Sequence, residues 1–142
     1  MGPKIFTVKE ANASLPAVEE VLAALDAARN RIRKIKGKMD LLEMLWGDEV
    51  TAESNPDYKE HRAYAQELDK AAKEHEAVLD RLKDLDVTLK SVETGLIDFY
   101  GVIDSRLVFL CWKRGEPEVA WYHHLEDGFA GRREIEPQYK AI

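Results

Sequence analysis

The sequence predicts an α+β protein: a long antiparallel helical hairpin followed by a three-stranded antiparallel β-meander packed on the helices. Two observations lead to this prediction. Apolar residues recur at steps of three and four over residues 8–46 and 56–93, which is the spacing of a helical seam. Over residues 96–125 the chain changes to short β-branched and aromatic runs separated by turn residues, which is typical of strands. A chain of 142 residues is expected to form a single domain.

The first helix is expected over residues 8–46. Thr7 and Glu10 have the spacing of a capping box, in which each side chain bonds the backbone N–H of the other. Pro16 predicts a kink, or a second start near Ser14. The apolar positions form two parallel lines along the helix, one of Val18, Leu25, Ile32, Met39 and Trp46 and the other of Val21, Ala28, Ile35 and Leu42.

The second helix is expected over residues 56–93. Asn55 before Pro56 indicates its start, and Gly95 indicates its end. The short connection between the helices predicts an antiparallel hairpin. His61 falls on the apolar stripe, where we expect it to meet Glu43 across the hairpin.

Three strands are expected within residues 96–125, in "LIDFYGVID", "RLVFLCWKRG" and "EVAWYHHLE", with residues 126–142 forming a turn and a tail. If both turns are tight, the strands align in two apolar rows that face the helices. These rows are Phe99, Leu110 and Trp121, and Ile97, Trp112 and Val119.

Charge and composition restrict the function. The net charge of −6 argues against a general nucleic-acid binder, whose surface is usually basic. Residues 29–38 carry six positive charges, so an RNA-associated role through this segment stays open, although a solvated helix face explains it more simply. One cysteine and the absence of a long apolar run predict a cytoplasmic protein that does not enter a membrane.

Several short motifs resemble those of one prokaryotic family. They are "FTVKEANASLP" (6–16), "GLIDF" (95–99), "LCWKRGE" (110–116), "WYH" (121–123) and "GFAGR" (128–132), and they are similar to the domain of unknown function 2203. The resemblance implies no activity, because that family has none established. It implies that six residues occupy motif positions: Asp98, Cys111, Trp112, Glu116, His123 and Arg132.

The densest chemistry lies in residues 118–135. In an ideal strand His123 shares the apolar face with Trp121, and a neutral, hydrogen-bonded core histidine is the simpler interpretation. The alternative is a binding site for a divalent metal or a small anion. Under this alternative the protein is either an enzyme or a binding protein without activity. Cys111 is expected to be an inert buried thiol. The candidate ligands are His123, His124, Glu126, Asp98, Glu116 and Arg132.

The end of the hairpin is unusually apolar. Apolar side chains cover most of the helix circumference there, which usually marks an interface unless the following loop covers it. We therefore expect a homo-oligomeric binding or interaction module, in the simplest case a homodimer. The candidate interface residues are Leu41, Leu42, Met44, Leu45 and Trp46.

Overall fold

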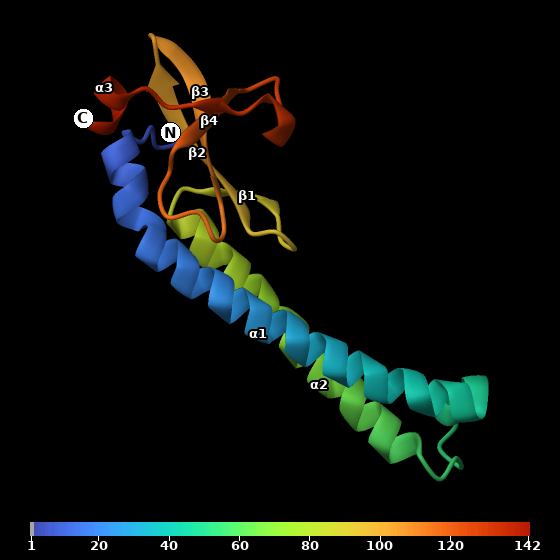
Figure 1. Cartoon of the computed structure of the whole chain (residues 1–142). Helices are drawn as coiled ribbons and strands as arrows, with labels where there is room; N and C mark the ends of the chain where they lie inside the picture. The colour runs from blue at the N-terminus through green and yellow to red at the C-terminus, as the bar shows by residue number, and fades with distance from the viewer. Residues whose placement is uncertain (1) are drawn as a thin grey trace. The chain divides into compact units, whose positions relative to one another are not determined.

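The computed structural model describes residues 2–142 and combines long helices with an antiparallel sheet, so the predicted α+β class is confirmed (Figure 1). The chain divides into two compact units. Residues 2–22 and 80–142 form the first, here called the sheet unit, and residues 23–79 form the second, called the hairpin unit. That the chain behaves as one domain stays a prediction.

Helix α1 (Val8–Trp46) has the predicted bounds. Its capping box is present: the Thr7 N–H donates to Glu10 Oε1 at 2.9 Å, and the Glu10 N–H donates to Thr7 Oγ1 at 3.1 Å. These two bonds satisfy donors that a helix start otherwise leaves open. Helical geometry continues through Pro16, so the second start predicted near Ser14 is not found.

Helix α2 (Tyr58–Asp84) is shorter than predicted at both ends, and a 3₁₀ turn, η1 (Gly47–Thr51), precedes it. Asn55 Oδ1 accepts the Asp57 N–H at 2.9 Å, so the Asn-Pro pair forms a turn before the helix rather than its first residues. Asp86 ends the helical run in a left-handed conformation, with φ at 59°. The residues after it, which were predicted as helix, form a strand.

The sheet has five strands rather than three, in the sequential order β1-β2-β3-β4-β5, all antiparallel. The extra strands are β1, which replaces the end of the predicted second helix, and β5, which lies in the predicted tail. A 3₁₀ turn, η2 (Phe129–Gly131), and a short helix, α3 (Pro137–Lys140), flank β5. The strands are β1 (Thr88–Ser91), β2 (Leu96–Ile103), β3 (Arg106–Lys113), β4 (Trp121–His124) and β5 (Arg133–Glu134).

The register between β2 and β3 is the predicted one. Phe99 pairs with Leu110, and Ile97 pairs with Trp112. All four side chains are buried on the same face of the sheet. Phe6, just before α1, packs edge-on against Phe99 with ring centroids 5.1 Å apart, so this face carries the main core of the sheet unit.

The register between β3 and β4 differs from the prediction by one residue. Trp121 pairs with Cys111 rather than aligning with Leu110, so it lies on the opposite face and is only half-buried. The connection is not tight: residues 114–120 separate the strands, and the Val119 N–H donates to Asn12 Oδ1 at 2.7 Å. Because side chains alternate along a strand, this one-residue slip moves every β4 side chain to the other face.

The hairpin unit has the predicted antiparallel pair of helices (Figure 1). Ile35 and Leu42 of α1 and Ala71 of α2 are buried in its seam. His61 Nε2 lies 3.0 Å from Glu43 Oε1, as predicted. At the closed end, the Trp46 indole N–H donates to Asp57 Oδ2 at 2.8 Å.

Candidate functional sites

The register of β4 decides which polar side chains meet. The sequence pattern placed His123 on the apolar face, away from Asp98. In the structure His123 pairs with Phe109, and Asp98 pairs with Cys111, so His123, Asp98 and Cys111 share one face of three adjacent strands. One nitrogen, one sulfur and one carboxylate oxygen from them lie within 4.8 Å of one another, and all three side chains are buried. We call these residues the polar centre.

The imidazole of His123 is held from both sides. Nδ1 lies 2.9 Å from the carbonyl oxygen of His124, and Nε2 lies 3.2 Å from both carboxylate oxygens of Asp98. Since a carbonyl only accepts, Nδ1 carries a proton and donates it. Nε2 then faces a carboxylate, which also accepts. A proton shared by Nε2 and Asp98, or another cation, is needed to make this contact attractive.

Cys111 completes the polar centre and is inert as a nucleophile. Burial, followed by the nearby Asp98 carboxylate, raises the pKa of its thiol from 9.0 to about 12. The thiol is therefore protonated at neutral pH, whereas the thiolate is the reactive form. This agrees with the inert thiol predicted from the sequence. Cys111 was not among the candidate ligands predicted from the sequence, and it lies beside two of them, Asp98 and His123.

Glu116 and Arg132 form a second contact next to the polar centre. Arg132 donates to both carboxylate oxygens of Glu116, at 2.6 and 3.0 Å, and to the Cys111 carbonyl at 3.3 Å. Its guanidinium also lies 5.1 Å from the Trp121 ring centroid and 4.6 Å from that of Phe129. An internal carboxylate thus takes the position that a small anion would need at Arg132.

The Glu116 carboxylate is fixed in its ionised form. Burial alone would raise the pKa of Glu116, but hydrogen bonds from Arg132 and from the Lys113 N–H outweigh it and the pKa is lowered. The backbone of Glu116 is held as well, because its carbonyl accepts the Trp112 indole N–H at 3.0 Å.

Two predicted ligands lie elsewhere. Glu126 is exposed and pairs with Arg106 at 2.7 Å, so it does not join the polar centre. His124 follows His123 in β4 and therefore points to the other face of the sheet, with Tyr122 as its ring neighbour at 6.1 Å.

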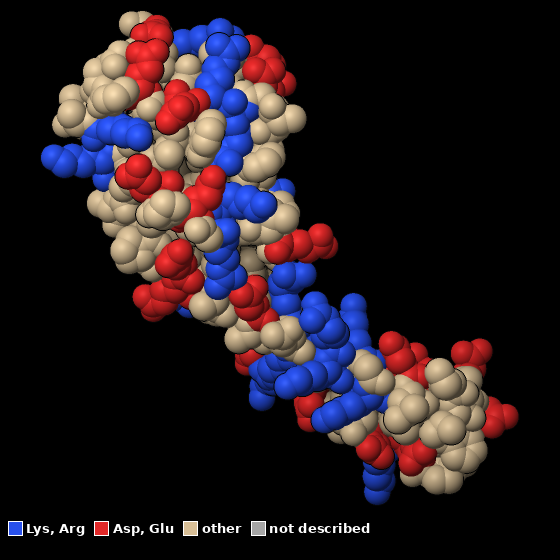
Figure 2. All heavy atoms as spheres, in the orientation of Figure 1, with Lys and Arg blue, Asp and Glu red and all other residues tan. Residues whose placement is uncertain are grey.

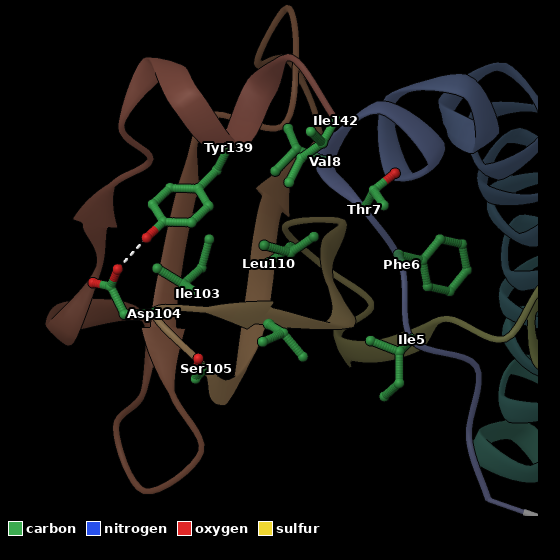
Figure 3. Close-up of a pocket in the computed structure, with 11 residues that line it drawn as sticks. Ile5, Phe6, Thr7, Val8, Ile103, Asp104, Ser105, Leu110, Tyr139 and Ile142 are labelled. Atoms are coloured by element: carbon green, nitrogen blue, oxygen red, sulfur yellow. Dashed lines mark hydrogen bonds between the residues drawn. The ribbon is translucent and has the colours of Figure 1, made fainter.

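A cavity of about 520 Å³ lies at another part of the sheet unit, between the segment before α1, the β2–β3 turn and the C-terminal residues (Figure 3). Its lining is mostly apolar, including Ile5, Leu110 and Ile142. Its main polar feature is a hydrogen bond from the Tyr139 hydroxyl to Asp104, which raises the pKa of Tyr139. Both polar groups are therefore already paired.

The end of the hairpin unit is partly covered. Leu42 is buried, and Trp46 is half-buried with its indole N–H donating to Asp57. Leu41, Met44 and Leu45 are 58%, 82% and 66% exposed, and we call them the apolar patch. In Figure 2 the uncharged groups at this end are bordered by acidic ones, and basic groups gather in the neighbouring part of the hairpin.

A protein-family profile described as "Uncharacterized conserved protein (DUF2203)" matches residues 4–135. The chain belongs to this family. The match covers nearly all of the chain and confirms the family that the sequence was found to resemble. No curated protein and no solved structure matches the chain. Within residues 2–142, no helix has both the length and the apolar character needed to cross a bilayer.

The six residues assigned to motif positions of the domain of unknown function 2203 form one connected network. Asp98 and His123 are in direct contact, and Cys111 lies beside them. The Cys111 carbonyl accepts from Arg132, Arg132 holds Glu116, and the Glu116 carbonyl accepts from Trp112. Residues far apart in the sequence are thus joined in one polar network of the sheet unit, buried at Asp98, Cys111 and His123 and partly exposed at Glu116 and Arg132.

Proposed function

We propose that this protein is an interaction module that associates with a second copy of itself through the end of its helical hairpin. The observation that carries the proposal is the apolar patch. Leu41, Met44 and Leu45 follow one another at helical spacing on α1, so they occupy one side of the helix. Large apolar side chains that stay mainly exposed together usually mark a contact surface.

The distribution of charge supports a second copy as the partner. Six basic residues lie within 29–38, on one side of the apolar patch along the chain, and Asp48 and Glu49 lie on the other side. Two copies that meet at their patches in opposite orientations would place acidic groups of one copy near basic groups of the other.

The expected strength follows from the composition of this surface. A stable interface buries about 800 Å² per partner, which is more than three side chains supply. The aliphatic parts of the neighbouring lysines and arginines must contribute the rest. Exposed ion pairs add only about 0–1 kcal/mol each, but they select the antiparallel orientation and make association sensitive to salt.

Light scattering at micromolar concentration tests the proposal. Wild-type protein should have the mass of a dimer, and the double variant Met44→Lys, Leu45→Lys should have the mass of a monomer with unchanged helix content by circular dichroism. The matched control is Ala65→Lys, Gln66→Lys, which adds the same two charges at exposed positions of α2 and should remain dimeric. A monomeric wild type, or equal dissociation of both variants, contradicts the proposal.

A further inference from the structure

The polar centre brings together three kinds of metal-binding group in a buried place. Asp98 comes from β2, Cys111 from β3 and His123 from β4, and their exposed fractions are 1%, 0% and 4%. Burying such groups costs free energy unless each has a partner. The strands bring the carboxylate, thiol and imidazole together at the centre of the sheet, where an apolar core would have been simpler to build.

The hydrogen bonds of His123 direct its free nitrogen inward. Nδ1 donates to the His124 carbonyl at 2.9 Å, which leaves Nε2 as the atom that faces Asp98 and Cys111. A histidine that binds a metal almost always donates its other ring N–H to a carbonyl or a carboxylate in this way. The contact thus fixes both the tautomer and the direction of the ring for Nε2 coordination.

From this arrangement we propose that Asp98, Cys111 and His123 bind one divalent metal ion of the zinc type. Sulfur and imidazole ligands favour zinc or cobalt over magnesium and calcium, which prefer oxygen. One oxygen of Asp98, the Cys111 thiolate and the His123 imidazole give three protein ligands. A zinc ion with three protein ligands completes its tetrahedral coordination with a water molecule.

The distances fit such an ion. Two ligand atoms at about 2.0–2.1 Å from a metal and at a tetrahedral angle lie about 3.3 Å apart. The two Nε2-to-oxygen distances are 3.2 Å. The Cys111 sulfur lies within 4.8 Å of the other two ligand atoms.

Charge balance also fits. Bound as a thiolate, a carboxylate and a neutral imidazole, the three ligands carry two negative charges. A divalent ion cancels these two charges, so the occupied site buries no net charge, which a site this deep in the protein requires.

Cobalt substitution tests the proposal with the whole chain. The protein is unfolded, freed of metal with a chelator and refolded with Co²⁺, because a buried site fills most readily during folding. We expect one Co²⁺ per chain, a sulfur-to-cobalt charge-transfer band in the near ultraviolet and visible absorption of tetrahedral cobalt. Zn²⁺ should remove both spectral features by competition and raise Tm.

Two adjacent histidines provide the matched variants. His123→Gln should weaken Co²⁺ binding by more than about 100-fold, since losing a ligand should exceed the 10–100-fold effect of losing an outer contact. His124→Gln keeps the carbonyl that orients His123 and should bind as wild type. Cys111→Ser preserves the side-chain shape and should abolish the charge-transfer band, which gives a second test if His123→Gln does not fold.

The outcome separates a metal site from a buried hydrogen-bonded cluster. Folded wild-type protein that takes up no Co²⁺, or binds it without the sulfur band, overturns the proposal. Equal loss in both histidine variants also overturns it. Because the polar centre lies in the sheet unit and the apolar patch in the hairpin unit, failure of one proposal leaves the other standing.

Discussion

Replacing Trp112 by alanine should destabilise the protein more than the same change at Trp121. Trp112 is fully buried on the face of the sheet that packs against Phe6 and the start of α1, and its indole N–H donates to the Glu116 carbonyl at 3.0 Å. Trp121 lies on the other face and is half-buried, with the Arg132 guanidinium 5.1 Å from its ring.

The magnitude follows from these environments. Truncating a fully buried tryptophan costs about 3–5 kcal/mol, because transfer free energy is lost and a cavity remains. The lost hydrogen bond to Glu116 adds about 0.5–1.5 kcal/mol. Trp121 is less completely buried and loses less apolar contact, with a cation–π contact of about 0.5–1 kcal/mol, so its truncation should cost less than that of Trp112.

Urea unfolding followed by circular dichroism measures both values, since the signal does not depend on the tryptophans removed. The m value should stay close to that of the wild type, so that the change in midpoint reports stability. A Trp121→Ala variant that is destabilised as much as Trp112→Ala, or more, would refute the β4 register and the opposite-face position of Trp121.

Three further predictions concern the sheet unit. The pKa of Glu116 is lowered in the folded protein, so its ionised form stabilises the fold at pH values above the ordinary pKa of 4.5. This contribution is lost as the pH falls through the pKa of the folded state. The variant Glu116→Gln should therefore flatten the acid side of a curve of Tm against pH. Native Cys111 should resist iodoacetamide at neutral pH and react fully in urea, as mass spectrometry can show, because it is buried and its pKa is about 12. Gly101→Ala should lower the free energy of unfolding in urea by about 1–3 kcal/mol, because the new Cβ would lie 2.7 Å from Cγ of the buried Leu110. Gly128→Ala is the control, because a Cβ there would meet no atom of the described residues within 4 Å beyond its chain neighbours.

Local signals in the sequence were enough to predict α1 and the hairpin of β2 and β3. The capping box at Thr7 and Glu10 depends on neighbouring residues, and so does the tight turn between β2 and β3 at Asp104 and Ser105. The pairing of Phe99 with Leu110 follows directly from that turn. Asp98 lies opposite Cys111 for the same reason.

The polar centre could not be predicted because it depends on a distant contact. The connection from β3 to β4 contains Gly115, whose φ is 103°. It is held by a hydrogen bond from the Val119 N–H to the side chain of Asn12, a residue far away in the sequence. A tight turn and the observed loop differ by one residue of register, which exchanges the two faces of β4. His123 was therefore assigned to the face opposite Asp98.

The predicted end of α2 was wrong for a related reason. Leu85, Leu89 and Val92 continue the helical spacing, so periodicity alone extends the helix. In the structure this segment instead forms β1 and pairs with the edge of β2, with Thr88 opposite Asp98 and Leu89 opposite Ile97. The four-residue strand β1 is stabilised by its pairing with the longer β2. The local sequence pattern does not indicate this pairing.

The sheet unit is discontinuous in the chain, and this has a consequence for how the protein is made. Its first part, residues 2–22, is synthesised before the hairpin unit, and its second part, residues 80–142, is synthesised after it. The hairpin unit between them is continuous and has all its residues first. Until β2 and β3 appear, Phe6, Val18 and their neighbours have no sheet to cover them. This apolar segment is therefore where a nascent-chain chaperone would be expected to bind, and its release should coincide with synthesis of the last strands.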